Sequence, residues 1–302
     1  MNRRTIQALV VCLALAGTAF GQINSSTYHY VAINFPGAAS TEAHGINNFG
    51  EIVGFFNIGV ANCQFGSTLC RFHGFKLKNK VFTRIDIPGA TDTRVLGVND
   101  GGDVVGDYRT SDNNIHGFLL HHTGALQKIN QPGSSGFTST SGVNNSLTVV
   151  GTGVTGFIWK NGVFTKLDIT NHTIGGESET INGISNLGVI VGSLFRQDFQ
   201  NAWQKRGSDL DVYQRINGLD TLLNGVNGRD DVVGTASVLN RGFVSFHVES
   251  SETGETSEAL KPVRIHFPNS TDTTPWSINY AQSIVGAFTG SDNVSHGFLA
   301  VH

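Results

Sequence analysis

The segment Gly97–Gly106, with the sequence GVNDGGDVVG, decides the fold of this chain. Five more segments share its plan, a Gly-(Ile/Val)-Asn core or a close variant followed by a closing Val-Gly pair. They read GINNFGEIVG at Gly45–Gly54, GVNNSLTVVG at Gly142–Gly151, GISNLGVIVG at Gly183–Gly192, GVNGRDDVVG at Gly225–Gly234 and SINYAQSIVG at Ser277–Gly286. Successive closing glycines are 41 to 52 residues apart, and no helical periodicity accompanies them. A repeat of this length indicates propeller blades.

Each repeat predicts four short β-strands. Strand a ends at the Gly-Ile-Asn core, where the Asn side chain can bond to the backbone two residues on and begin a tight turn. Strand b is of the apolar Glu-Ile-Val-Gly type, strand c of the His-Gly-Phe type, and strand d of the Ile-Asp-Ile-Pro-Gly type seen at Ile85–Gly89. Two-residue turns such as Asn79-Lys80 join c to d. Such a meander of four strands is one blade.

The two ends of the chain complement each other. Tyr28–Gly37 reads as a lone d-type strand, and His296–His302 as a lone c-type strand. The N-terminal strand can therefore complete the sixth blade and remove the open edges that a linear array would leave. We predict an all-β fold, a six-bladed β-propeller of four-stranded antiparallel blades, as a single domain of residues 22–302. An open solenoid is the alternative.

The repeat pattern GINNxGxIVG followed by His-Gly-Phe resembles the HAF-repeat family of bacterial extracellular repeat proteins. The resemblance extends over Tyr28–His302 and is most specific in the first, second and sixth copies. Those copies carry His73-Gly74-Phe75, His116-Gly117-Phe118 and His296-Gly297-Phe298, and the others carry Thr155-Gly156-Phe157, Ala202-Trp203 and Arg241-Gly242-Phe243. The resemblance implies export and a β-repeat fold. It implies no activity, so no catalytic residue is carried over.

The first 21 residues have the three parts of an export signal. Arg3 and Arg4 supply positive charge, Ile6–Ala19 is mostly apolar, and Ala19-Phe20-Gly21 places small residues before a cleavage site. No later stretch is long and apolar enough to predict a membrane span. We predict a signal peptide at residues 1–21 and a mature chain secreted to the extracellular space or the periplasm.

Export bears on the oxidation state expected of the cysteines. Cleavage would remove Cys12 and leave Cys63 and Cys70, an even pair that predicts a disulfide in an oxidising compartment. A metal site is the alternative, and it lacks a second cysteine pair.

Only 14% of the residues are charged, the net charge is −3 and no basic block is present, which argues against nucleic acid as a partner. Neither a cofactor nor a metal ion is predicted.

The histidines of the His-Gly-Phe motif are interpreted as structural. Counting outward from the c–d turn of the first blade places His73 opposite Asp86, and His296 would face Asn34 by analogy. An imidazole in this position can hydrogen-bond across the ladder. A pair repeated in several blades suits holding each blade together rather than one chemical step. The pair His121-His122 follows strand c at a turn and is interpreted as exposed and without a role.

One face of the propeller is expected to carry the function. The a–b and c–d turns share one face and are mostly tight, whereas the b–c and d–a loops share the other face and differ between copies. Binding residues concentrate on variable loops held by a rigid scaffold, so we predict a site at the channel mouth on the b–c/d–a face. The candidate ligand-binding residues in these loops are Glu42, His44, Asp92, Arg94, Tyr108, Arg109, Glu177, Glu179, Arg196 and Trp276.

His44 and Trp276 directly precede the core of strand a in the first and sixth blades, so we expect them to be neighbours near the channel. Aromatic faces combined with carboxylate, guanidinium and amide groups are typical of carbohydrate sites. The sequence therefore favours a binding module for extracellular glycan or cell-surface material.

Two alternatives stay open. The first is an extracellular hydrolase or polysaccharide lyase, with the pair Glu177/Glu179 as acid and base, or with His44 beside Tyr108 or Arg109 to abstract a proton. The second is a protein-interaction scaffold acting through the long loop Phe55–Arg71. No specific enzyme signature is present, so no catalytic residue is assigned.

Overall fold

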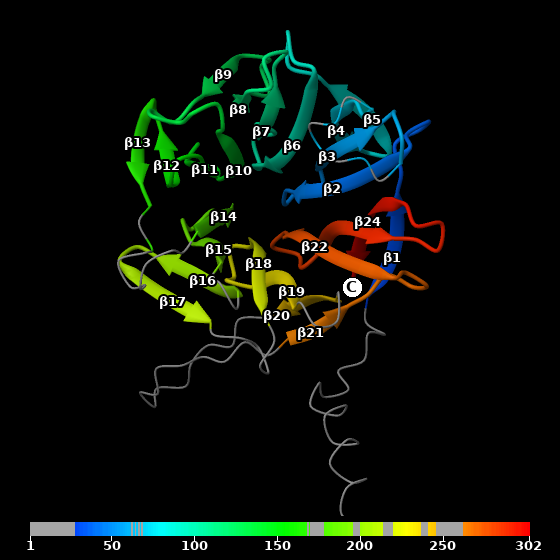
Figure 1. Cartoon of the computed structure of the whole chain (residues 1–302). Helices are drawn as coiled ribbons and strands as arrows, with labels where there is room; N and C mark the ends of the chain where they lie inside the picture. The colour runs from blue at the N-terminus through cyan, green and yellow to red at the C-terminus, as the bar shows by residue number, and fades with distance from the viewer. Residues whose placement is uncertain are drawn as a thin grey trace, which may run out of the picture.

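The computed structural model describes residues 28–61, 63, 65, 67, 69–167, 169, 178–195, 200–213, 220–236, 241–245 and 262–302. These residues form six blades of four antiparallel β-strands around a central axis, so the predicted six-bladed propeller is confirmed (Figure 1). The predicted signal peptide and the candidates Glu177 and Arg196 lie outside the described residues. Across the described ranges, no helix is long and apolar enough to cross a bilayer.

Every blade runs outward from an inner strand beside the axis to an outer strand at the rim. The first three blades consist of β2 (Ser40–Ile46), β3 (Ile52–Asn57), β4 (Phe72–Lys78) and β5 (Val81–Ile85); β6 (Asp92–Val98), β7 (Val104–Arg109), β8 (Ile115–Leu120) and β9 (Leu126–Ile129); and β10 (Ser139–Val143), β11 (Val149–Thr152), β12 (Gly156–Lys160) and β13 (Val163–Lys166). The other three consist of β14 (Ser178–Ile184), β15 (Ile190–Phe195), β16 (Gln200–Arg206) and β17 (Asp209–Tyr213); β18 (Thr221–Val226), β19 (Val232–Ala236), β20 (Arg241–Ser245) and β21 (Pro262–Ile265); and β22 (Asp272–Ile278), β23 (Ile284–Thr289), β24 (Ser295–Val301) and β1 (His29–Ile33).

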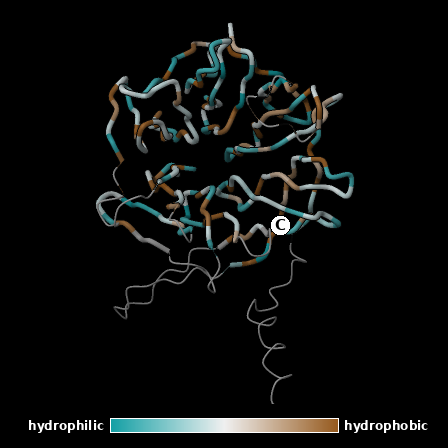
Figure 2. The backbone as a smooth tube through the Cα atoms, in the orientation of Figure 1, coloured by the Kyte–Doolittle hydropathy of each residue, from teal (hydrophilic) through white to brown (hydrophobic). Residues whose placement is uncertain are grey.

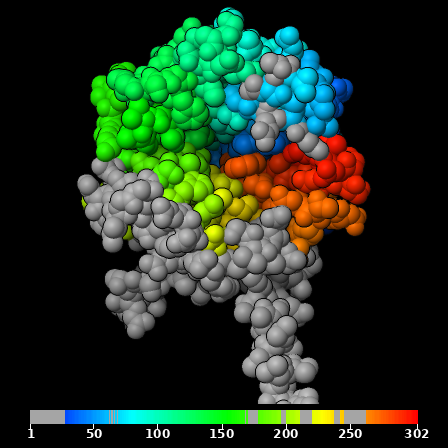
Figure 3. All heavy atoms as spheres, viewed as in Figure 1, coloured from blue at the N-terminus to red at the C-terminus, as the bar shows by residue number. Residues whose placement is uncertain are grey.

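The N-terminal strand closes the ring. β1 pairs antiparallel with β24, from His29 opposite Val301 to Ile33 opposite Gly297. The first and last described parts of the chain therefore lie side by side, blue against red, in Figure 3. Closure by the N-terminal strand is thus confirmed, and the open solenoid is excluded.

The hydrophobic core is divided among the six junctions between neighbouring blades, and Figure 2 shows hydrophobic segments in every blade. At each junction the Val before the closing glycine of one blade shares a cluster with the aromatic residue at the His-Gly-Phe position of the next blade. The pairs are Val53 with Phe118, Val105 with Phe157, Val150 with Trp203, Val191 with Phe243, Val233 with Phe298 and Val285 with Phe75. Because each such side chain contributes about 1.5–3 kcal/mol on full burial, the repeated motif supplies the same stabilisation six times.

The closing glycine makes room for that aromatic ring. Gly54 pairs with Phe75 across the b–c ladder, and Gly286 pairs with Phe298. A Cβ atom on Gly54 would lie 2.9 Å from the Phe75 ring, and one on Gly286 would lie 2.6 Å from the Phe298 ring. The Val-Gly pair and the His-Gly-Phe motif are therefore two halves of one packing unit.

The asparagines of the repeat core tie the blades together at the end of the channel that carries the a–b and c–d turns, here named the turn end. Asn47 Oδ1 accepts the N–H groups of Phe49 and Glu51, which confirms the predicted turn. Its Nδ2 donates to the Asn99 carbonyl of the next blade at 3.0 Å. The same link joins Asn99 to the Asn144 carbonyl, Asn144 to that of Ser185, Asn227 to that of Asn279, and Asn279 to that of Asn47. In blade 4, Ser185 replaces the asparagine, and its short hydroxyl accepts from the Val189 N–H.

A polar cluster fills the axis at the turn end. The Asp100 carboxylate accepts hydrogen bonds from the Nδ2 groups of Asn48, Asn145 and Asn186 at 2.9, 2.7 and 3.1 Å. Burial alone would raise the pKa of Asp100, but these bonds hold it below its ordinary value. Side chains that bond to one another thus occupy this end of the channel, and the open end is the one that carries the b–c and d–a loops, here named the loop end.

The histidines of the His-Gly-Phe motif join strands c and d. His73 Nδ1 lies 2.7 Å from Asp86 Oδ1, and His296 Nδ1 lies 2.9 Å from Asn34 Oδ1, as predicted. His116 Nδ1 makes the equivalent contact with Asn130 at 2.9 Å. Three polar pairs at matching positions support the structural interpretation of these residues.

Candidate functional site

Every inner strand carries one β-bulge inside the channel; in blade 1 the paired residues Ser40–Ala43 lie on its loop-end side, and Gly45 and Ile46 on its turn-end side. In blade 1 the pairing register shifts between Ala43 and Gly45, and the other five inner strands shift at the equivalent place. A bulge leaves one residue unpaired and re-aims its side chain. The six bulged residues, here named the bulge ring, are His44, Leu96, Ser141, Asn182, Asn224 and Trp276. They line an axial cavity of about 60 Å³, which holds a few water molecules and is far smaller than a usual ligand pocket.

In five blades a glycine follows the bulge and brings the inner strands close together, and Ser277 takes this place in blade 6. A Cβ atom on Gly97 would lie 3.1 Å from the Ser141 carbonyl oxygen, and one on Gly225 would lie 2.6 Å from the Trp276 carbonyl oxygen. At these two places a side chain would press on the backbone of the neighbouring inner strand. The glycine of the repeat core therefore keeps the channel narrow directly below the bulge ring.

On blades 3 to 5, the bulge ring links neighbouring blades. Ser141 Oγ donates to the Ile181 carbonyl at 2.5 Å, Asn182 Nδ2 to that of Leu223 at 2.7 Å, and Asn224 Nδ2 to that of Pro275 at 2.9 Å. Each of these bonds uses one donor, and the amide oxygens of Asn182 and Asn224 stay available as acceptors for a ligand. All three residues line the axial cavity.

On blades 6 and 1, the bulge ring is aromatic. The Trp276 and His44 rings stack with centroids 4.6 Å apart, as their equivalent positions led us to expect, and the Phe55 ring lies 4.8 Å from His44. His44 Nε2 contacts Glu42 Oε2 at 3.1 Å, and Ser295 Oγ donates to the other Glu42 oxygen at 3.4 Å. The Trp276 Nε1 atom is buried without a hydrogen-bond partner. Such a donor costs about 1–3 kcal/mol unless a ligand or water satisfies it.

A disulfide loop covers the mouth beside blade 2. Cys63 and Cys70 form the predicted disulfide, with Cα atoms 5.9 Å apart. Phe65, inside this loop, lies under the guanidinium of Arg94, whose Cζ is 3.9 Å from the ring centroid. Arg94 also makes two hydrogen bonds to Asp107, at 2.9 and 2.7 Å. Burial would lower the pKa of Arg94, but the Asp107 carboxylate raises it, so Arg94 stays charged and paired with Asp107.

Other candidate residues belong to the scaffold. Arg109 donates to Asp92 through Nε and Nη2 at 2.8 and 2.6 Å, and Asp92 also accepts the Phe72 N–H. Tyr108 is 2% exposed and packs against His116 and Phe118 inside blade 2. These side chains are occupied within the protein, so the idea that Tyr108 or Arg109 assists His44 in proton abstraction is wrong for this structure.

Glu179 is likewise engaged in the scaffold, because its Oε1 accepts the Gly156 N–H of the neighbouring blade at 3.1 Å. Glu177, its partner in the predicted acid–base pair, lies outside the described residues. Within the described ranges, no three His, Cys, Asp or Glu side chains converge as metal ligands.

The eight described candidates were expected in loops, and all lie in strands. Glu42 and His44 are in β2, Asp92 and Arg94 in β6, Tyr108 and Arg109 in β7, Glu179 in β14 and Trp276 in β22. The bulge explains the difference, because the inner strand resumes pairing beyond the unpaired residue and runs on toward the loop end. Sequence reasoning also missed Leu96, Ser141, Asn182 and Asn224. The sequence feature that could have identified these four residues is their position directly before the repeated glycine.

Comparisons with known proteins agree with the strand order. The chain matches no protein-family model and no curated protein. Similar solved structures include a streptogramin B lyase (TM-score 0.51, 13% identity, covering 90% of this chain and 87% of that chain) and virginiamycin B lyase from Staphylococcus aureus (TM-score 0.50, 11% identity, 89% and 88%). A luciferin-regenerating enzyme is also similar (TM-score 0.50, 10% identity, 91% and 95%). At these identities the likeness establishes the β-propeller fold alone.

Proposed function

We propose that this protein is an exported binding module that holds extracellular glycan at the loop end of its central channel. The observation that carries the proposal is the bulge ring. One backbone feature, repeated in six blades, presents stacked aromatic rings on blades 6 and 1 and oxygen acceptors on blades 3 to 5. A sugar offers the complementary surfaces, since its ring has an apolar face and its hydroxyl groups donate hydrogen bonds.

The size of the axial cavity limits how the sugar binds. A cavity of about 60 Å³ cannot enclose a sugar ring, so the ring lies across the mouth and only a hydroxyl group enters. That hydroxyl can accept from the unpartnered Trp276 Nε1 and donate to Asn182 or Asn224. Glu42, about one-quarter exposed beside His44, supplies an acceptor at the edge.

Export is part of the proposal. The apolar segment Ile6–Ala19 supports it, and so does the disulfide between Cys63 and Cys70, because disulfides persist in oxidising compartments. The resemblance of the repeat to the HAF-repeat extracellular proteins points the same way.

The test is a thermal-shift screen of the purified chain without residues 1–21 against neutral and acidic oligosaccharides and polysaccharides. A ligand at one hundred times its Kd adds about 2.7 kcal/mol to the free energy of unfolding, which gives a clear shift. We expect Trp276→Ala and His44→Ala to lose the shift. Tyr280→Ala, an exposed aromatic change at the turn end of the same blade, is the control and should keep it. A screen without any shift would reject the glycan proposal.

A protein partner is the second candidate, and one observation favours it. The disulfide loop exposes Ile58, Val60 and Leu69 to solvent, at 49, 57 and 69%. Apolar side chains grouped on one loop suit a protein interface. If the glycan screen fails, loss of a captured partner on Leu69→Ser would support this candidate. Turnover of any bound glycan would instead support an enzyme.

A further inference from the structure

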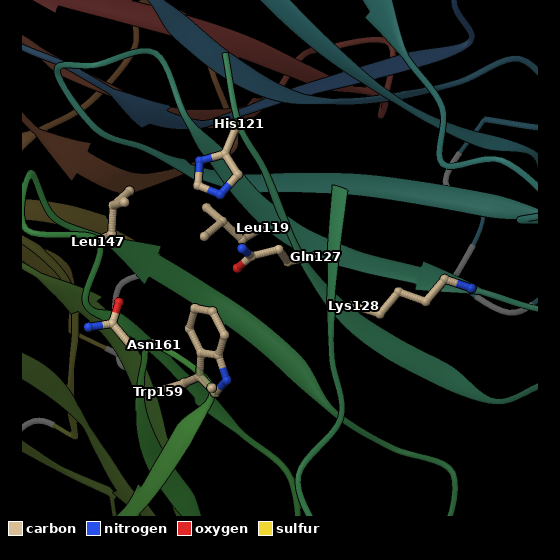
Figure 4. Close-up of a pocket in the computed structure, with 8 residues that line it drawn as sticks. Leu119, His121, Gln127, Lys128, Leu147, Trp159 and Asn161 are labelled. Atoms are coloured by element: carbon tan, nitrogen blue, oxygen red, sulfur yellow. The ribbon is translucent and has the colours of Figure 1, made fainter. Parts of the chain in front are cut away.

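A larger cavity lies far from the bulge ring, at the turn-end side of the junction between blades 2 and 3. It measures about 420 Å³, within the range of small-molecule sites. Leu119, Leu147 and Trp159 supply its apolar lining, and His121, Gln127 and Asn161 its polar lining. Figure 4 shows these side chains around one common space, with Lys128 extending away from it.

Two other junctions carry a charged side chain at or near this level. At the junction of blades 1 and 2, Lys76 occupies the place that Leu119 has in blade 2, since each directly follows the aromatic residue that pairs with a closing glycine. Its Nζ donates to the Gly102 carbonyl at 2.9 Å and fills the gap. At the junction of blades 4 and 5, Arg206 makes an ion pair with Asp230. Blade 2 has the buried Leu119 here, and blades 3, 5 and 6 also carry an apolar residue at this place, namely Ile158, Val244 and Leu299.

The lining has little net charge. His121 was expected to be exposed, but its side chain is only 18% exposed and its Nδ1 lies 3.3 Å from Asp103 Oδ1. Burial opposes the charge on Asp103, yet hydrogen bonds from His122, Asn99 and His121 lower its pKa to about 2. Asp103 therefore stays ionised and bonded within the protein. The Lys128 amine is also directed elsewhere, 5.9 Å from the Tyr108 ring centroid.

We propose that this cavity is a second binding site, and that it takes one neutral sugar unit. The flat indole of Trp159 suits the apolar face of a sugar ring. The amides of Gln127 and Asn161 can each donate to and accept from hydroxyl groups. An ionised ligand would find no opposite charge free to meet it among the lining residues. The proposal does not depend on the site at the channel mouth, and with both sites one molecule would bind two glycan chains.

The variant Leu119→Lys tests the site by giving blade 2 the lysine that blade 1 has at the equivalent position, Lys76. Leu147 has a positive φ of 55°, as Gly102 has at its equivalent place, so a lysine at 119 can reach the Leu147 carbonyl as Lys76 reaches that of Gly102. The lysine would extend into the cavity, and because Leu119 is buried in the core cluster of this junction, the variant is also expected to be less stable. Val81→Lys is the matched control, because it adds the same charge at an exposed site on blade 1.

The probes are methyl glycosides of glucose, galactose, mannose, fucose and N-acetylglucosamine, together with their β-linked disaccharides. Saturation-transfer NMR detects binding of each probe, and titration measures its affinity. We expect at least one probe to bind, the folded Leu119→Lys variant to weaken that binding at least tenfold, and Val81→Lys to bind as the original chain does. Trp276→Ala separates the two sites, since it removes binding at the mouth only.

If Leu119→Lys does not fold, Asn161→Gly replaces it, because glycine tolerates the positive φ of 50° at that turn while the amide is removed. We expect this variant to weaken binding at least threefold. The proposal is overturned if no probe binds, or if a probe binds the folded Leu119→Lys or Asn161→Gly variant as tightly as the original chain.

Discussion

The two ends of the central channel are built from neighbouring positions of the same repeat, and they differ in how closely the repeat is kept. At the turn end, five of six blades place asparagine at the turn and link it to the next blade, with Ser185 as the exception. On the loop-end side of these asparagines, the bulge ring holds five residue types, from leucine to tryptophan. The backbone is equivalent at both ends. Residue types that repeat from blade to blade are therefore those that hold the ring together, and residue types that vary form the surface available to a ligand.

Among the variants that test this comparison, Asn47→Ala has the largest expected effect on stability. It removes the acceptor for two buried N–H groups and the donor to the Asn99 carbonyl, so we expect a loss of about 3 kcal/mol in the free energy of unfolding. The loop-end counterpart Asn182→Ala removes one inter-blade bond and should cost about 1 kcal/mol. Chemical denaturation of both variants measures the difference. Equal losses would contradict the assignment of ring stability to the turn end.

Gly225→Ala tests the narrow level between the two ends. The new Cβ atom would lie 2.6 Å from the Trp276 carbonyl oxygen, and overpacking of this kind costs about 2 kcal/mol. Because the inner strand of blade 6 must shift, we also expect a change in Trp276 fluorescence. Ser277→Gly is the control, since blade 6 already carries a side chain at this level. A neutral Gly225→Ala would show that the inner strands are not in close contact.

Ser185→Asn should have the smallest effect and the opposite sign. The asparagine supplies the missing link to the Asn227 carbonyl and should stabilise the protein by about 1 kcal/mol. That corresponds to a rise of about 2–4 °C in the melting temperature, measured by calorimetry. Ser185→Ala removes the acceptor for the Val189 N–H and should lower the melting temperature. An unstable Ser185→Asn would mean that blade 4 departs from the repeat for a packing reason.

The repeated features of the fold were predictable because each follows from local chemistry. The Asn47 turn, the pairing of His73 with Asp86 and the closure of blade 6 by β1 all follow from residue type and spacing along one blade. The inner-strand bulges were not predictable, since an unpaired residue changes neither the hydrophobic pattern nor the motif. As a result, residues assigned to loops, such as His44 and Trp276, lie within strands.

The sequence by itself determined how many blades there are, how their strands pair and where the ring closes, because each repeat carries its own turns, glycines and aromatic residue. Only the tertiary structure decided which variable residues meet. The bulge ring takes one side chain from each blade, and the cavity at Leu119 is lined by residues of two blades, with Leu147 and Trp159 supplied by the neighbouring blade. Contacts of this kind join residues tens of positions apart. Their geometry depends on how the blades pack, which no local pattern records.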